Sequence, residues 1–141
     1  MDKKFEYLEH TADKKFRAFG STLEEAFKNS GLAMFNILVN PEDVKPEIKH
    51  KLKVNTRKLE SLLYDFLEEL LILLDTDGFV LSSIDKIEIK EKDGIFDLVC
   101  EFSGDSYKNY EVSGNIKSIT YNDMKIEKVN NNYEITAVVD I

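Results

Sequence analysis

The stretch RKLESLLYDFLEELLILL, residues 57–74, decides the fold. Its apolar residues recur at spacings of three and four, which is the period of one face of an α-helix. That face comprises Leu59, Leu62, Leu63, Phe66, Leu67, Leu70, Leu71 and Leu74, while Glu60, Asp65, Glu68 and Glu69 form the polar face. A stripe this broad has to be buried against another layer. The run Asp75-Thr76-Asp77-Gly78 is expected to end the helix, because Gly78 suits a left-handed turn.

A second amphipathic helix is predicted upstream, over residues 22–39. Ser21 or Thr22 can cap its first turn. Its apolar face comprises Leu23, Ala26, Phe27, Met34, Phe35 and Leu38. The helix should stop before Pro41, since the residue that precedes a proline avoids the helical conformation.

The rest of the chain alternates apolar and polar residues with the period of β-strands. Strands are predicted at residues 5–8, 16–20, 48–54, 84–90, 95–102, 116–127 and 133–141. Asp93-Gly94 and Asn130-Asn131-Asn132 are turn signals between neighbouring strands. The sequence therefore predicts one α+β domain over residues 1–141, with two layers: two amphipathic helices packed on a largely antiparallel sheet. The sheet is expected to be mixed, with some parallel pairs, because helices connect several of the strands.

The composition fits a globular protein and limits its partners. The 141 residues are 43% hydrophobic and 33% charged, enough for one core. A net charge of −8 disfavours strong direct binding of nucleic acid, which needs clustered lysines and arginines, and suits docking on a basic protein surface. The single cysteine, Cys100, lies in an apolar alternating run, so a buried strand thiol is expected.

Signals for targeting and for independent catalysis are missing from the sequence. The first ten residues are charged and the longest apolar run is far too short to span a bilayer, so no signal peptide or membrane contact is predicted and a cytoplasmic location is expected. There is no glycine-rich phosphate loop, nucleophile elbow, CxxC pair or HExxH pair. Two histidines and one cysteine do not make a zinc site of the usual kind.

Two places carry polar residues whose role the local pattern leaves open. His10 and Asp13 stand between two predicted strands, and on spacing alone they are a packed histidine and a turn residue. The run 138–141 ends in Asp140-Ile141 and is strand-like. If Ile141 is anchored in a sheet, its α-carboxylate and that of Asp140 would attract a hard cation such as Ca²⁺ or Mg²⁺. The alternative is an exposed acid without a function.

Several segments follow one another in a specific order. They are EHTAD at residues 9–13, FGSTLEEAF at 19–27, the helix at 62–71, IKSITY at 116–121 followed by Met124, and VDI at 139–141. Together, over residues 5–141, they resemble the archease family. Archeases help the GTP-dependent RNA ligase of tRNA splicing: they promote its guanylylation and let it turn over many times. The resemblance therefore implies a non-catalytic activator whose partner is that ligase, with a chaperone-like effect on a tRNA cytosine methyltransferase as a further role.

The resemblance also implies the functional residues. Asp13 and Asp140 match the acidic metal-site residues of the family, and Ile141 matches the terminal residue that contributes its carboxylate or backbone oxygen. Lys117 matches a lysine that is important for activation. We expect the first three to hold one divalent cation, Ca²⁺ or Mg²⁺, with Lys117 close by. Because Asp13 and Asp140 stand at opposite ends of the chain, this requires the first and last strands to be neighbours or nearly so.

Two other functions stay open at the level of sequence. A metal-dependent phosphohydrolase or nuclease would need His10 or His50 as its base, and the sequence offers it few ligands. A binding module or chaperone for RNA-modifying enzymes would not need the carboxylates. The chain also departs from the family at residues 122–123, which are Asn-Asp where many relatives have His-Glu, and at residues 108–109, where a histidine is often found. A histidine at those positions is therefore not required here.

Overall fold

The computed structural model describes residues 3–10 and 13–141, which form strands and helices in the predicted order. The elements are β1 (Phe5–Leu8), β2 (Asp13–Gly20), α1 (Leu23–Asn36), the 3-10 turn η1 (Pro41–Asp43), β3 (Ile48–Thr56), α2 (Leu59–Asp77), β4 (Phe79–Lys92), β5 (Ile95–Ser106), the 3-10 turn η2 (Tyr107–Asn109), β6 (Ser118–Val129) and β7 (Asn132–Asp140). Within the described ranges, neither α-helix combines the length and the apolar composition needed to cross a lipid bilayer.

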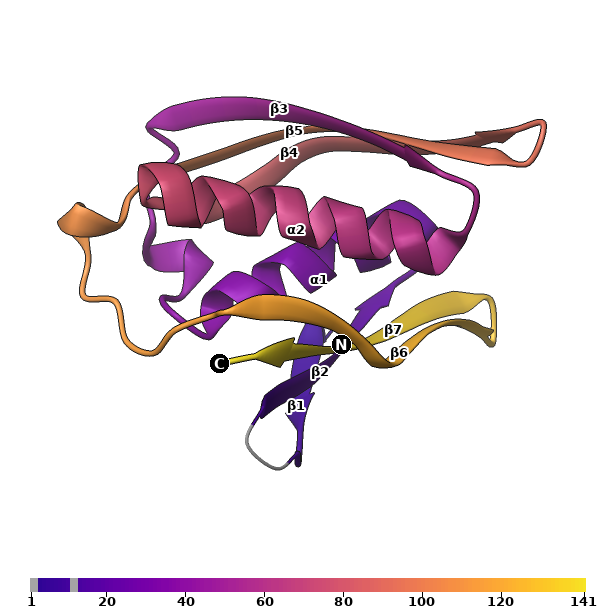
Figure 1. Ribbon diagram of the computed structural model, residues 1–141, viewed down its shortest axis with the longest axis horizontal. Helices are drawn as coiled ribbons and strands as arrows, with labels where there is room; N and C mark the ends of the chain where they lie inside the picture. Colours follow the sequence, from indigo (N-terminus) through magenta and orange to yellow (C-terminus); the bar gives the residue numbers. More distant parts are fainter. Residues whose placement is uncertain (1–2, 11–12) are drawn as a thin grey trace.

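The strands form two sheets, with the helices between them (Figure 1). One sheet has the order β1-β2-β7-β6 and the other the order β3-β5-β4. Helix α1 packs against β2 and β7 on one side and β4 on the other, and α2 packs against β6 and β3. The α+β class, with two helices packed on antiparallel sheet, is confirmed. The predicted two layers are three in the structure, because the strands divide into two sheets and the helices pack against both of them.

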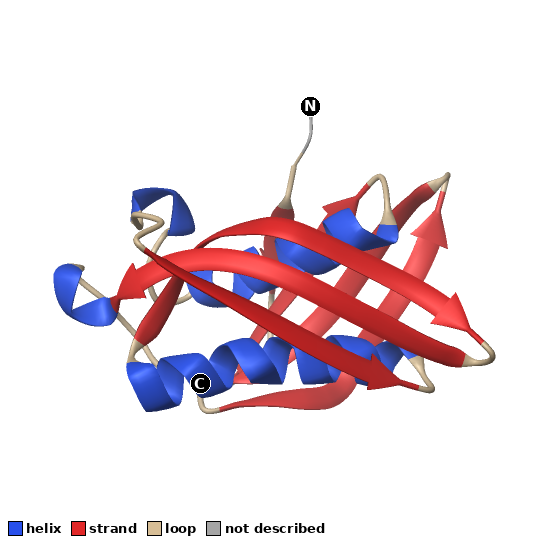
Figure 2. Ribbon diagram, turned by 90° about the horizontal axis from the view of Figure 1, so that it is seen from above, coloured by secondary structure: helices blue, strands red, loops and turns tan. Residues whose placement is uncertain are grey.

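Strand direction differs from the expectation. Every pairing among the described strands is antiparallel, so the expected parallel pairs are wrong. Helix α1 leads from β2 in one sheet to β3 in the other, whereas α2 connects β3 and β4, which lie in one sheet but are separated there by β5. Figure 2, seen from above, shows the long strands of the second sheet crossing over both helices. A helical connection therefore does not force two adjacent strands to run parallel here.

Burial of α1 on nearly all sides explains why it lies between two sheets. Its buried residues are Ala26, Phe27, Asn29, Ser30, Gly31, Leu32, Ala33, Met34 and Phe35. A helix that is covered all round needs packing partners on both sides. Its two buried polar side chains are satisfied locally: Asn29 Nδ2 donates to the Phe19 carbonyl at 2.7 Å, and Ser30 Oγ donates to the Ala26 carbonyl at 2.9 Å. These hydrogen bonds remove the cost of burying polar groups.

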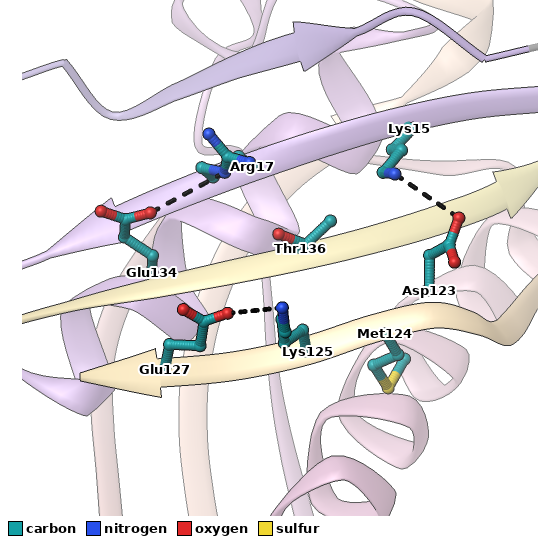
Figure 3. Close-up of a pocket in the computed structure, with 8 residues that line it drawn as sticks. All are labelled: Lys15, Arg17, Asp123, Met124, Lys125, Glu127, Glu134 and Thr136. Atoms are coloured by element: carbon teal, nitrogen blue, oxygen red, sulfur yellow. Dashed lines mark hydrogen bonds and ion pairs between the residues drawn. The ribbon is translucent and has the colours of Figure 1, made fainter. Parts of the chain in front are cut away.

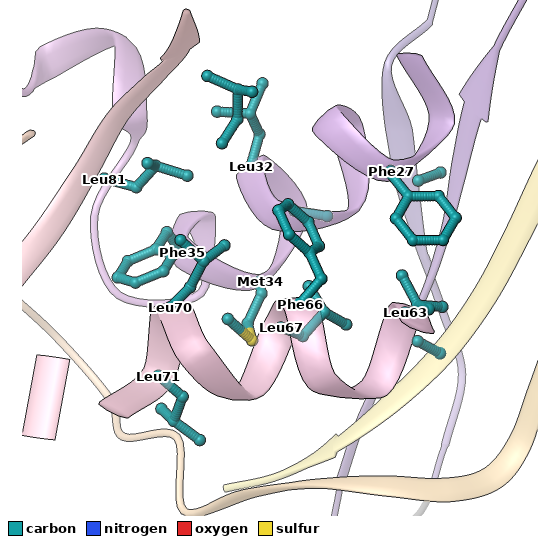
Figure 4. Packing of buried hydrophobic residues seen from close by; sticks show 14 of the residues in the cluster. Phe27, Leu32, Met34, Phe35, Leu63, Phe66, Leu67, Leu70, Leu71 and Leu81 are labelled. Carbon is teal, nitrogen blue, oxygen red and sulfur yellow. The ribbon is translucent and has the colours of Figure 1, made fainter. Parts of the chain in front are cut away.

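The core lies where the two helices meet (Figure 4). Phe27 of α1 packs against Phe66 of α2, with ring centroids 5.9 Å apart. Gly31 allows the close approach, because a Cβ at this position would lie 3.2 Å from Leu70 Cδ1. Cys100 is fully buried in the same core, as predicted, and burial together with nearby Asp85 raises the pKa of its thiol to about 12. The thiol is therefore a core group and a poor nucleophile.

The helix boundaries differ from the sequence prediction by a few residues. Thr22 caps α1, its Oγ1 accepting from the Glu25 N–H at 3.1 Å, as expected. Helix α1 stops at Asn36, three residues before the predicted end at Val39. Helix α2 starts at Leu59 and runs on to Asp77, so the predicted turn at 75–77 is wrong, although Gly78 does end the helix in a left-handed conformation with φ of 68°.

Among the strands, β4 is the element that sequence periodicity locates worst. It begins at Phe79, five residues before the predicted start. Register shifts between Leu81 and Ser83 and between Ile84 and Lys86 break its alternation, which hides the strand from a period-two search. The predicted turns are confirmed: the Asp93-Gly94 and Asn130-Asn131 pairs all have positive φ, the geometry of tight two-residue hairpins.

Replacing Leu70 by alanine tests the core. Leu70 is 0% exposed, so Leu70→Ala should lower the free energy of unfolding by about 2–5 kcal/mol through lost burial and the cavity left behind. Ile72 is a matched control on the same helix, because it is 44% exposed. Ile72→Ala should change the free energy of unfolding by less than about 0.5 kcal/mol. Urea denaturation measures both. If both variants lost the same free energy of unfolding, α2 would not turn Leu70 toward the core and Ile72 toward solvent as described.

Candidate functional site

The pairing of β2 with β7 brings the two predicted acidic residues together. The antiparallel register sets Asp13 directly opposite Asp140. Ile135, Ala137 and Val139 of β7 lie in the core, so the alternating side chain of Asp140 points to the outer face of the sheet, and Asp13 points the same way. Opposed residues of this kind have Cα atoms about 4.5–5.5 Å apart. The predicted proximity of strands from the two ends of the chain is confirmed.

Strand β6 and the residue before it lie next to the two opposed aspartates. Ser118, its first residue, is the other neighbour of Asp140. Just before it, the Lys117 N–H donates to the Asp140 carbonyl at 2.7 Å. That hydrogen bond fixes the last peptide of β7, but the strand ends at Asp140, so Ile141 lies just beyond the sheet and is 36% exposed. We refer to Asp13, Asp140, Ile141 and Lys117 as the β2–β7 corner.

His10 lies beside the corner, between two carboxylates. Its Nδ1 is 3.9 Å from Asp13 Oδ2, and its Nε2 is 3.7 Å from Asp123 Oδ2. Nδ1 is buried and has no hydrogen-bond partner in the part of the chain that the structure describes. Thr11 and Ala12 of the EHTAD segment lie outside the described residues. Asp13 itself begins β2, so it is a strand residue and the turn interpretation is wrong.

A bulge in β6 supplies Asp123. The register jumps from Thr120 opposite Val138 to Lys125 opposite Thr136, so residues 121–124 face a single residue of β7. Asp123 has φ of 56°, a left-handed conformation that aspartate tolerates better than most residues. Bulges of this kind redirect side chains. Here the carboxylate reaches across β7 to within 3.4 Å of Lys15 Nζ on β2.

Neighbouring residues anchor the bulge on the helix layer. Tyr121 stacks on Tyr64 of α2, with ring centroids 4.3 Å apart and 10° between the ring planes. Burial, with smaller contributions from Glu68 and Tyr121, raises the pKa of the Tyr64 hydroxyl. Met124 points away from Asp123 toward α2 (Figure 3) and packs against the core. Contacts with α2 and the core therefore hold the bulge on its inner side, while the Asp123 carboxylate lies on the outer face of the sheet.

A hollow of about 290 Å³ lies next to Asp123 on the outer face of the sheet (Figure 3). It is lined by Lys15, Arg17, Asp123, Met124, Lys125, Glu127, Glu134 and Thr136. Its charges are paired: Lys125 Nζ is 2.9 Å from Glu127 Oε1, and Arg17 Nε is 3.8 Å from Glu134 Oε1. Three basic and three acidic side chains balance, so the lining offers no net charge to a polyanion.

The chemistry of the β2–β7 corner fits a divalent cation. Like charges directly opposite each other on a sheet destabilise it, and a cation between Asp13 and Asp140 removes that repulsion. Within residues 3–10 and 13–141, however, no three His, Cys, Asp or Glu side chains already lie close enough to form a finished site. Partly exposed side chains change rotamer in picoseconds to nanoseconds, so the carboxylates can swing inward without a change of backbone.

Comparison with known proteins decides the family. The model of the Archease protein family (MTH1598/TM1083) matches residues 5–141. The chain belongs to the archease family. Protein archease of Methanosarcina mazei is 41% identical to it over 141 residues, which are 99% of this chain and 97% of that protein. Protein archease of Pyrococcus furiosus is 41% identical over 129 residues, 90% of each chain.

Solved structures agree with the fold of this archease. The solution structure of Methanobacterium thermoautotrophicum protein 1598 has a TM-score of 0.84 and 29% identity, and the match covers 98% of this chain and 99% of that one. The crystal structure of a Thermotoga maritima archease, described as a possible chaperone, has a TM-score of 0.57 at 19% identity and covers 95% and 94%. The second likeness shows the fold alone.

Removing one charge of the opposed pair tests the corner in metal-free protein. Asp140→Asn should raise the free energy of unfolding of this archease by about 0.2–1 kcal/mol at low salt, because it ends the repulsion with Asp13. The gain should shrink at high salt. Glu127→Gln, which breaks an ion pair with Lys125, should bring no gain. Chelator-treated protein and urea denaturation provide the measurement, and a loss of stability in Asp140→Asn would contradict the predicted repulsion.

Proposed function

We propose that this archease activates the GTP-dependent RNA ligase of tRNA splicing, promoting its guanylylation and its multiple turnover, by presenting a divalent cation at the β2–β7 corner. The observation that carries the proposal is the register that sets Asp13 opposite Asp140 on an outer face. Family membership supports an accessory role. The same proposal places the protein in the cytoplasm together with the ligase.

Each residue of the β2–β7 corner has a definite task in this proposal. The side chains of Asp13 and Asp140 and the terminal carboxylate of Ile141 hold the ion. When bound, a divalent cation offsets charge on a phosphoryl group during nucleotidyl transfer. Lys117, whose backbone is hydrogen-bonded to Asp140, contributes a further positive charge next to the phosphates of GTP. The carboxylates repel one another without a cation, so the corner is built to keep one.

The arrangement favours an accessory protein over an independent hydrolase. The second histidine, His50, lies on β3 in the other sheet and packs against Phe79 and Phe102, with ring centroids 5.0 and 5.7 Å away. It therefore does not belong to the β2–β7 corner, and of the two possible bases only His10 lies beside the carboxylates. The guanylylated group and the RNA end belong to the ligase, and the archease supplies charge to the ligase active site from outside.

A turnover assay tests the proposal. The ligase is held well below its RNA substrate, with GTP and a divalent metal, and joined RNA is counted per ligase molecule. Wild-type archease should carry the ligase through many cycles, and Asp13→Ala or Asp140→Ala should reduce the rate at least about tenfold, as loss of a metal-site group does. Glu127→Ala, on the same face and away from the corner, should leave turnover unchanged.

The assay also separates the second candidate, a chaperone-like module for tRNA-modifying enzymes such as a tRNA cytosine methyltransferase. Such a module would need no carboxylate at the corner. Turnover that survives both alanine substitutions would favour it, and a ligase that stays near one turnover with wild-type archease would sink the ligase proposal altogether.

Extension of the chain tests the terminal carboxylate by itself. Two glycines added after Ile141 replace the α-carboxylate with a peptide, which removes one anionic ligand and leaves the side chains intact. Turnover should fall at least about tenfold. An equal extension at the amino end is the control. Full activity of the C-terminally extended protein, with an unchanged circular dichroism spectrum, would show that Ile141 is not a ligand.

A further inference from the structure

The placement of His10 goes beyond the carboxylate corner. Its ring lies between Asp13 and Asp123, one nitrogen toward each, at 3.9 and 3.7 Å. The nitrogen that faces Asp13 is buried and unpartnered among the described residues, whereas the other faces a carboxylate that the β6 bulge holds in place. A buried imidazole nitrogen without a partner is a costly arrangement unless something else binds to it.

The chemistry of imidazole decides what that partner is. A neutral imidazole carries a hydrogen on one nitrogen and a lone pair on the other. Asp13 and Asp123 are both acceptors only, but a cation held by Asp13 would disfavour a hydrogen on the nitrogen that faces it, which leaves the hydrogen on Nε2, toward Asp123. The lone pair then lies on Nδ1, which faces Asp13. Two lone-pair-bearing groups facing each other repel, and a cation between them turns the repulsion into coordination.

We propose that His10 is a further ligand of the divalent cation at the β2–β7 corner, through Nδ1, and that Asp123 is the positioning residue that holds its Nε2–H. Histidines that bind metals almost always donate their other N–H to a carboxylate, a carbonyl or a water. This inference rests on the proposed function, because it takes the ion of that proposal as given and adds a nitrogen ligand to it.

The observed spacing suits a shared ion. Ligand atoms about 2.0–2.2 Å from one metal lie roughly 3.0–3.6 Å from each other. Nδ1 of His10 and Oδ2 of Asp13 are 3.9 Å apart, so a shift of less than about 1 Å brings both to bonding distance. The Asp13 side chain is 27% exposed, so an ion reaches its carboxylate from solvent, and the same small shift brings the buried Nδ1 of His10 to the ion.

A nitrogen ligand changes which metal the corner prefers. Carboxylates alone suit Ca²⁺ and Mg²⁺, whereas imidazole favours first-row transition ions. The proposed site has three carboxylates, one of them terminal, and one imidazole. It should therefore select an ion that accepts both oxygen and nitrogen ligands, such as Mn²⁺. The corner should therefore bind Mn²⁺ more tightly than Ca²⁺, and the difference should depend on His10.

The decisive experiment uses the full chain and the metals alone. Isothermal titration with Mn²⁺ and with Ca²⁺ gives the two affinities, and electron spin-echo modulation of the Mn²⁺ complex reports a bound ¹⁴N directly. Wild type should show the nitrogen signal. His10→Gln should lose it, and should lose about 10–100-fold in Mn²⁺ affinity with little change for Ca²⁺, because the amide oxygen is still a hard ligand.

Two variants of Asp123 test its positioning role. Asp123→Gly removes the acceptor without straining the left-handed backbone and should weaken Mn²⁺ binding about tenfold. Asp123→Asn keeps an acceptor oxygen and should recover part of that loss. The double variant with His10→Gln should lose no more than His10→Gln alone, because both changes act on one interaction. Glu127→Gln is the matched control, 44% exposed against 49% for Asp123.

The outcomes separate this inference from the function on which it rests. If the wild-type Mn²⁺ complex shows no nitrogen signal, His10 is not a ligand. This measurement uses the wild-type protein alone and so does not depend on the folding of any variant. Equal losses for Mn²⁺ and Ca²⁺ in His10→Gln, or additive losses in the double variant, also overturn it, while the carboxylate site stands. If wild type binds neither ion, the metal site of the proposed function has failed, and the His10 ligand fails with it.

Discussion

The antiparallel pairing of β2 with β7 is the constraint on which the rest of the structure depends. It joins the beginning of the chain to its end and sets Phe16 opposite Ala137 on the side that faces the helices. The same ladder sets Asp13 opposite Asp140 on the other side. Because side chains alternate along a strand, a slip of β7 by one residue would turn its core residues outward and turn Asp140 toward the helices, away from Asp13. Core packing and site geometry therefore enforce a single register.

The two-sided helix layer gives this register its rigidity. Helix α1 is buried nearly all round and packs on β2 and β7 from within, so the strands that carry the corner rest on a close-packed core. The bulge in β6 is held in the same way, through Tyr121 stacked on Tyr64 of α2. Asp13 and Asp140 thus stand on regular strands and Asp123 on an anchored bulge, which keeps their backbones within a narrow range of geometry.

Local periodicity accounts for the elements that the sequence predicts well. The α2 stripe and the Asp93-Gly94 turn are signals within a few neighbouring residues, and the structure confirms both. The division into two sheets depends on which strands meet, which no local pattern contains. For the site, Asp13, Asp140, Ile141 and Lys117 came from the family resemblance. Asp123 is evident in the sequence only as a departure from the family, because the three extra residues of the β6 bulge have the pattern of an ordinary continuous strand until β7 is placed beside it.

The corner also carries a consequence for the order in which the protein is made. Strand β2 leaves the ribosome early, whereas its partner β7 follows every other described strand. Contacts between residues so far apart in sequence form late, since a large loop has to close first. A nascent chain can build its helix layer and its second sheet and still lack the acidic pair. The corner is complete only when β7 has paired with β2, so under the proposed function a partly made chain would lack the carboxylate pair.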